Sequence, residues 1–145
     1  MTPEQEINVS FFRFEDLRIY AKALDYITWL HGVTASFSDG KNCGLKASFL
    51  KSAEGIALNV AEGSARNKAQ FVYYLKMAKS SVRECVVYTE IASKLNLLNE
   101  EEKEHSRTQL MELTKMIGSL VASLQRATSF AKEEEMSMDD DMETI

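Results

Sequence analysis

Two glutamates, Glu62 and Glu84, are the side chains with the most consequential chemistry if the fold brings them together. Each lies in a helical pattern, and paired carboxylates support acid–base catalysis when their surroundings separate their pKa values. No histidine is near either residue in the sequence, and no glycine-rich phosphate loop is present. The sequence therefore predicts a non-enzymatic protein with no catalytic residue. It favours instead a structural polar network that turns inward at the end of the second helix, made of Asn59, Glu62, Arg66, Ser81 and Glu84.

Metal and cofactor sites are also disfavoured. Glu102 and His105 have the Glu-x-x-His spacing of one half of a di-iron bundle site, which needs a second such pair and two more glutamates. The other histidine, His31, has no ligand-spaced partner. Cys43 and Cys85 are far apart, outside any C-x-x-C pair, and we expect no disulfide in a reducing compartment. We predict no metal and no cofactor.

The charge is unevenly distributed along the chain. The formal net charge is −5, but residues 133–145 contain seven acidic and no basic residues, so the remainder is close to neutral. Residues 41–84 are basic, and clustered cations are what phosphate contact requires. The alternative is that these are ordinary solvated side chains, with Arg66 tied to Glu62. The candidate residues for RNA or DNA binding are Lys46, Lys51, Arg66, Lys68, Lys76, Lys79 and Arg83. The acidic tail would then compete for that surface.

The elements that position these residues are helices. Six glycines and one proline in 145 residues favour long helices over a turn-rich β fold. Apolar residues at intervals of three and four predict helices over about 15–36, 43–62, 68–95 and 100–130. Gly63 is placed to end the second helix in a left-handed conformation, and Asn67 and Asn99 to cap the third and fourth. Gly55 predicts a close approach between helices.

Short connections place successive helices antiparallel, which predicts an all-α, up-down-up-down four-helix bundle. The bundle is expected over residues 14–131, after an N-terminal extension (1–13) and before a disordered acidic tail (132–145). The first helix carries two apolar stripes, one more than a monomeric bundle needs, so we expect it to contact another subunit or a partner. No signal peptide and no membrane-length apolar run is seen, and we expect a cytoplasmic protein.

Three stretches resemble the bacterial family of 23S ribosomal RNA intervening-sequence proteins. They are FEDLRIYAKA (14–23), SAEGIALNVAEGSARN (52–67) and FVYYLKMAKSSVRECVVYTEIASKLNLL (71–98). The family's Asn, Glu-Gly and Arg at the end of the second helix match Asn59, Glu62–Gly63 and Arg66. The chain departs from the pattern at Leu50–Lys51, where an Arg pair is usual, and at Gly55 and Ala57, where Ser and Pro are usual.

The resemblance implies a small bacterial cytoplasmic protein with no established enzymatic activity. Some relatives resemble accessory proteins of retroelements, which form ring-shaped pentamers and engage a reverse transcriptase and nucleic acid. It therefore implies a ring-like homo-oligomer, most simply a pentamer, with RNA, DNA, a reverse transcriptase or another protein as possible partners. Because lysine lacks the bidentate phosphate geometry of arginine, the Leu50–Lys51 departure weakens the nucleic-acid expectation. The alternative is an oligomeric protein-interaction scaffold with no nucleic-acid role.

Overall fold

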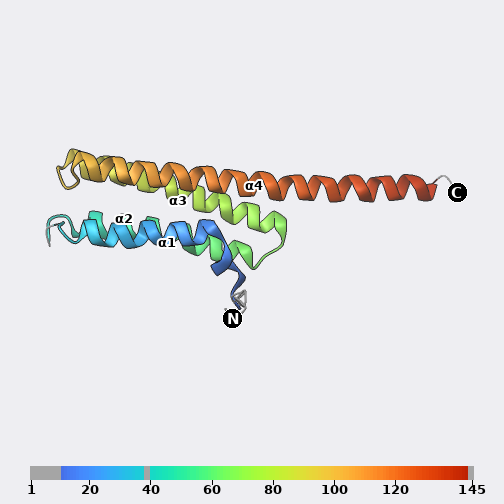
Figure 1. The fold of residues 1–145 in the computed structure, drawn as a ribbon, viewed down its shortest axis with the longest axis horizontal. Coiled ribbons are helices and arrows are strands. Elements are labelled where there is room, and N and C mark those ends of the chain that lie inside the picture. Colours follow the sequence, from blue (N-terminus) through green and yellow to red (C-terminus); the bar gives the residue numbers. More distant parts are fainter. Residues whose placement is uncertain (1–10, 38–39, 144–145) are drawn as a thin grey trace, which may run out of the picture.

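The chain folds into four antiparallel helices, seen here in a computed structural model that describes residues 11–37 and 40–143. A short 3₁₀ helix, η1 (Arg13–Asp16), precedes α1 (Arg18–Thr34), α2 (Cys43–Ser64), α3 (Lys68–Lys94) and α4 (Glu100–Glu143). Successive helices run in alternating directions, as the colour gradient in Figure 1 shows. The predicted all-α four-helix bundle is therefore confirmed, while most of the predicted N-terminal extension lies outside the described residues.

The core forms where the inward stripes of the four helices meet. Ile19, Ala23, Tyr26 and Leu30 supply the α1 stripe, and all four are buried. Each of the other helices contributes apolar residues at the same three-and-four spacing, which places them on one face of a 3.6-residue helix. The contact between α2 and α3 is the most extensive in the bundle, and the contact between α1 and α4 is the smallest between neighbouring helices. The bundle is thus tightest along α2–α3 and most open along α1–α4.

The predicted helix starts are confirmed in detail. The Asn67 side chain accepts a hydrogen bond from the backbone N–H of Gln70 over 2.9 Å. Asn99 and Glu102 form a reciprocal capping box, with side-chain to backbone distances of 2.8 and 2.9 Å. These bonds satisfy backbone donors that have no partner inside the helix, so both starts are fixed by local sequence.

The predicted role of Gly63 as a left-handed helix stop is wrong. Helix α2 continues through Gly63 to Ser64, and Gly40 and Asn96 are the residues with positive φ in the described parts of the chain. Gly63 is buried, and a Cβ atom built on it would lie 2.6 Å from the Tyr74 Cβ and 2.8 Å from the Phe71 ring. Glycine is therefore required here because α3 approaches too closely for any side chain. A milder form of the same contact, against the Ser81 side chain, confirms the predicted close approach at Gly55.

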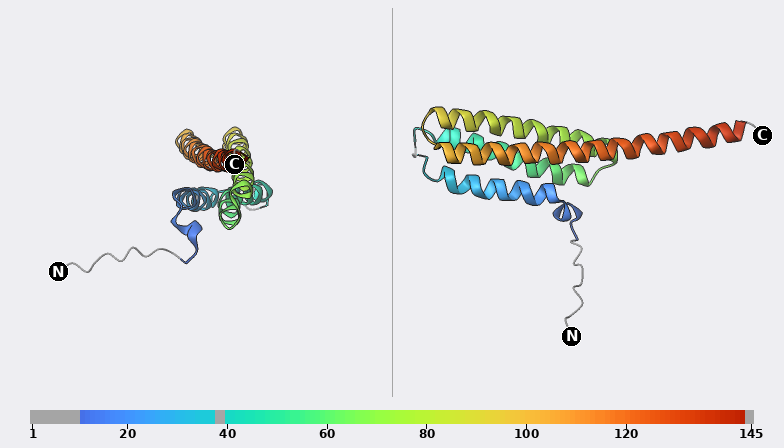
Figure 2. Two further views of the ribbon diagram at one scale, coloured as in Figure 1. Left: turned by 90° about the vertical axis from the view of Figure 1, so that its right-hand side faces the viewer. Right: turned by 45° about the horizontal axis from the view of Figure 1, so that its top comes forward.

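The prediction of a disordered tail from residue 132 is also wrong. Helix α4 continues without a break to Glu143 and extends well past the other three helices (Figures 1 and 2). The prediction rested on how little apolar surface this segment could bury. Helix propensity has the opposite effect, because residues 132–143 contain no glycine or proline and include four Glu and three Met, which favour helices. None of the helices within the described residues is long and apolar enough to cross a membrane.

Candidate interaction surfaces

The junction between α2 and α3 is clamped on its outer surface. The Arg66 guanidinium donates a hydrogen bond to the Glu62 carboxylate over 2.6 Å and lies 5.6 Å from the centre of the Tyr74 ring. Both charged side chains are about half exposed. The hydrogen bond that Arg66 donates to Glu62, together with the electrostatic effects of Tyr74 and Glu62, raises the pKa of Arg66 above its ordinary value. The predicted inward orientation of this pair is wrong, because an i,i+4 pair keeps both charges hydrated without a desolvation cost.

The other members of the predicted polar network make separate local contacts. Asn59 donates to the carbonyl of Gly55 in its own helix over 2.8 Å. Glu84 accepts a hydrogen bond from the Ser52 hydroxyl over 2.7 Å, which links α3 to α2. Since Ser52 precedes Glu62 by ten residues in one helix, the two carboxylates are held about 15 Å apart along α2. A Glu62–Glu84 acid–base pair is therefore excluded in this fold.

A buried chain of hydroxyl groups was missed by sequence reasoning. The Tyr26 hydroxyl lies 2.8 Å from the Ser106 hydroxyl, which lies 2.8 Å from the hydroxyl of Thr89. Thr89 also donates to the carbonyl of Cys85. All three hydroxyl-bearing residues are buried, and burial raises the pKa of Tyr26 above its ordinary value. These hydrogen-bonded hydroxyl groups join α1, α3 and α4. The one feature of the sequence that indicates them is that each hydroxyl residue occupies an inward position of its helix.

The predicted cation patch is not a single surface. Lys46 and Lys51 are five residues apart on α2, which places them about 140° apart around the helix. Arg66 is engaged with Glu62, and Lys68 is the first residue of α3. Three of the predicted residues do share one side of α3, and we call them the α3 cation stripe: Lys76, Lys79 and Arg83. None of the three forms an ion pair within the described residues.

A row of exposed apolar side chains follows α3 beside the cation stripe. Tyr73 and Val87 have 59% and 57% of their surface exposed, and the row ends at Leu95 with 54%. These fractions are large for residues of this size, and their spacing places them on one side of the helix. We call this row the α3 apolar stripe, and its members are Tyr73, Met77, Val87, Ile91 and Leu95.

A second apolar surface lies in the groove between α1 and α2. The groove has a volume of about 390 Å³. Its most exposed member is Leu58, at 68%. Of the two apolar stripes recognised in the first helix, the one that contains Tyr20, Leu24 and Ile27 supplies one wall of this α1–α2 groove. Its lining residues are Phe14, Tyr20, Leu24, Ile27, Glu54, Ala57, Leu58 and Ala61.

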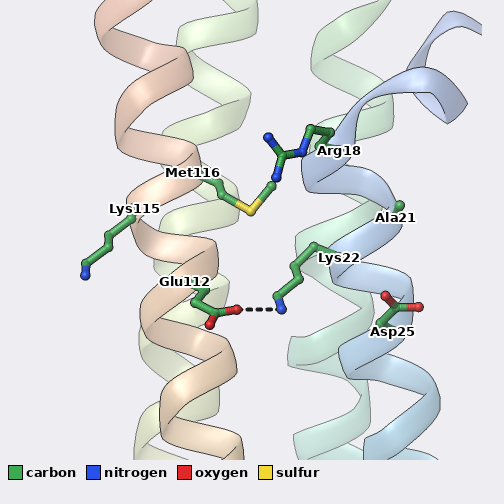
Figure 3. Close-up of a pocket in the computed structure, with 7 residues that line it drawn as sticks. All are labelled: Arg18, Ala21, Lys22, Asp25, Glu112, Lys115 and Met116. Atoms are coloured by element: carbon green, nitrogen blue, oxygen red, sulfur yellow. Dashed lines mark ion pairs between the residues drawn. The ribbon is translucent and has the colours of Figure 1, made fainter.

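The open side of the bundle, between α1 and α4, holds a polar pocket of about 480 Å³ (Figure 3). An ion pair between Lys22 and Glu112 crosses the pocket, and this pair lowers the pKa of Glu112. Arg18 extends toward the Met116 side chain, and Asp25 lies on the α1 side. Because cations and carboxylates alternate here, the pocket offers no strong preference for a charged ligand.

Metal chemistry finds no support among the described residues, in which no three His, Cys, Asp or Glu side chains group as ligands. Glu102 is committed to capping α4. The His105 ring packs 4.6 Å from the Trp29 ring. Cys43 is exposed and Cys85 is buried, and both are free thiols.

Comparison with known proteins gives a family and a fold. The model of the family described as 23S rRNA-intervening sequence protein matches residues 15–119. A crystal structure from Bacteroides thetaiotaomicron, described as a protein with unknown function from the S23 ribosomal protein family, superposes with a TM-score of 0.67. The two chains are 18% identical, and the match covers 72% of this chain and 95% of the other. No curated protein sequence matches the chain.

Proposed function

This chain belongs to the 23S rRNA-intervening sequence protein family, and we propose that it is a non-enzymatic module that assembles with copies of itself. The observation that carries the proposal is the presence of two different exposed apolar surfaces. The α1–α2 groove is concave and the α3 apolar stripe is a convex row, and they lie on different helices. Exposed apolar side chains that gather on one face of a small protein mark an interaction site.

Two unlike surfaces support a head-to-tail contact rather than a two-fold one. In a two-fold dimer each copy uses the same surface, whereas a head-to-tail contact joins one surface to a different one and generates a ring when the rotation closes. The groove of one copy would receive the α3 apolar stripe of the next. The resemblance noted from the sequence favours a pentamer, and in this reading the assembled ring is a scaffold for protein partners.

The experiment is a mixing test with one variant for each surface. Leu58→Glu blocks the groove and Val87→Glu blocks the α3 apolar stripe, so each alone should be monomeric by sedimentation velocity at about 0.5 M salt, where contacts between exposed charges are screened. Because each variant retains one intact surface, an equimolar mixture should form a dimer and nothing larger. Met111→Glu, an apolar position on α4 with 51% of its surface exposed, is the control and should assemble as the parent does. A parent chain that is monomeric, or a mixture that stays monomeric, would contradict the head-to-tail contact.

Nucleic-acid binding is the second candidate, and the α3 cation stripe is the observation that favours it. Three cations that lie on one side of a helix and form no ion pair can neutralise phosphates of a nucleic-acid backbone. The replacement Lys76→Gln/Lys79→Gln/Arg83→Gln should then weaken binding of a single-stranded RNA. It should also lower the slope of log affinity against log salt by about two, at about 0.7 per phosphate contact. An unchanged slope would place any RNA contact elsewhere.

A further inference from the structure

The end of α4 forms an acidic arm outside the bundle. We define the arm as residues 133–143, a helical segment that contains seven acidic and no basic residues. The side chains of Glu133, Glu134 and Glu135 are exposed. Figures 1 and 2 show the arm projecting beyond the ends of the other helices. A helix with this charge repels itself unless a cationic surface lies against it.

The α3 cation stripe has the complementary charge and length. Lys76 and Arg83 are seven residues apart, so the stripe spans about 10 Å of α3. The arm, residues 133–143, rises about 15 Å along its helix, which is longer than the stripe. The arm and the stripe are therefore opposite in charge, and the arm is long enough to cover the stripe.

The arm cannot reach the stripe of its own chain. The contacts of Thr89 with Ser106 and of Glu90 with Arg107 fix the antiparallel alignment of α3 with α4. This alignment places Lys76 level with about residue 119 of α4. Glu133 is fourteen residues further on, or about 21 Å beyond that level. Residues 119–133 include no glycine or proline that would let the helix turn back.

We propose that the acidic arm of one copy binds the α3 cation stripe of a second copy. The contact joins carboxylates to ammonium and guanidinium groups across two helices, and it adds to the apolar contact proposed above without depending on it. It also gives the stripe an occupant that competes with nucleic acid, because both are polyanions. When it is not bound to the stripe, an arm with seven acidic residues repels RNA from the assembly.

The experiment is a charge-swap series on the full chain, measured by sedimentation equilibrium at about 0.05 M and about 0.5 M salt. The arm variant is Glu133→Lys/Glu134→Lys/Glu135→Lys, and the stripe variant is Lys76→Glu/Lys79→Glu/Arg83→Glu. A third variant combines both sets. The matched control, Lys41→Glu/Lys46→Glu/Lys51→Glu, makes the same change in net charge as the stripe variant, but on α2 and the loop before it. A second readout, for the parent, the stripe variant and the control, is the rate of trypsin cleavage after Lys132, which a bound arm should slow.

The arm and stripe variants should each weaken self-association about tenfold at low salt, as expected for three exposed ion pairs. The stripe variant should also speed cleavage after Lys132. The combined variant should regain parent affinity within about threefold, and the differences should vanish at high salt. Failure of the combined variant to regain affinity, or equal weakening by the control, overturns the proposal. A stripe variant that loses RNA binding but associates and is cleaved as the parent also overturns it, and assigns the stripe to nucleic acid. Leu58→Glu should abolish assembly at high salt but should still show the effects of the arm and stripe variants on self-association at low salt. This result would separate the charge contact from the apolar contact.

Discussion

Replacing Gly63 by alanine tests the reason for the glycine at the α2–α3 junction. Alanine is favoured over glycine inside a helix by about 1 kcal/mol, and by less in a last turn, so propensity alone predicts a small gain. The added methyl group, however, would lie 2.6 Å from the Tyr74 Cβ and 2.8 Å from the Phe71 ring. A Cβ atom is fixed to the backbone and cannot rotate away, so the junction itself must open.

Overpacking of this kind costs about 1–3 kcal/mol, and the fixed Cβ contact places this site at the upper end. After the propensity gain is subtracted, we expect Gly63→Ala to lower the free energy of unfolding by about 2 kcal/mol. Thermal unfolding should then shift down by about 5–8 °C. The measurement is urea denaturation of parent and variant, followed by circular dichroism, with the slope m compared to confirm that the unfolding transition is the same.

Gly118 provides the matched control, because it lies in α4 and a Cβ atom there would meet nothing within 4 Å. Gly118→Ala should therefore raise the free energy of unfolding by about 0.5–1 kcal/mol. The two glycine-to-alanine changes are chemically identical and have opposite expected signs. A Gly63→Ala protein as stable as the parent, with Gly118→Ala behaving as expected, would refute the close-approach explanation.

Three further predictions concern the buried hydroxyl chain, one ion pair and the thiols. Ser106→Ala should cost about 1–3 kcal/mol in urea denaturation because it leaves the buried Tyr26 hydroxyl without its partner, while the exposed Ser119→Ala should change little. Glu112→Gln should slightly destabilise the protein at pH 7. The pKa of Glu112 is lowered in the folded protein, so its carboxylate stabilises the fold above the ordinary pKa of 4.5, and this stabilisation is lost as the pH falls below that value. The free energies of unfolding of parent and variant, measured over an acid titration, should therefore become equal at low pH. Iodoacetamide at pH 8 should modify the exposed Cys43 in the native protein and should react with Cys85 only after unfolding. The reason is that burial excludes the reagent and raises the pKa of Cys85 to about 12. Rapid labelling of Cys85 in the native protein, detected by mass spectrometry, would contradict its burial.

The fold was predictable because helices and caps depend on local sequence. Asn67 and Asn99 cap their helices through side chains three residues from the backbone groups they satisfy, and such contacts follow from spacing alone. The inward stripe of α1 was equally clear, since periodicity identifies which residues share a face. Gly63 shows where this reasoning fails. A glycine near a helix end suits both a left-handed stop and a close helix contact, and only the position of α3 distinguishes them.

Surface features were harder to predict because they depend on how elements face one another. Lys46 and Lys76 both belong to the basic middle of the sequence, yet they lie on different helices. Net charge over a segment reports how many cations are present and not which of them share a face. The inward prediction for Glu62 failed for a related reason, because an arginine four residues away offered a hydrated partner at no desolvation cost.

The departures of this chain from the pattern of the family it resembles fall on both the packed and the exposed side of α2. Gly55 stands where a serine is usual, and its missing side chain leaves room for Ser81 of the neighbouring helix. Ser52 then reaches Glu84 one turn away, so the α2–α3 contact has polar as well as apolar support. Lys51, in place of an arginine, is exposed on the outside of the same contact. Because a substitution on the exposed side of a helix disturbs no close packing, we expect differences in partner choice within this family to reside in the outer faces of α2 and α3 and in the length of α4.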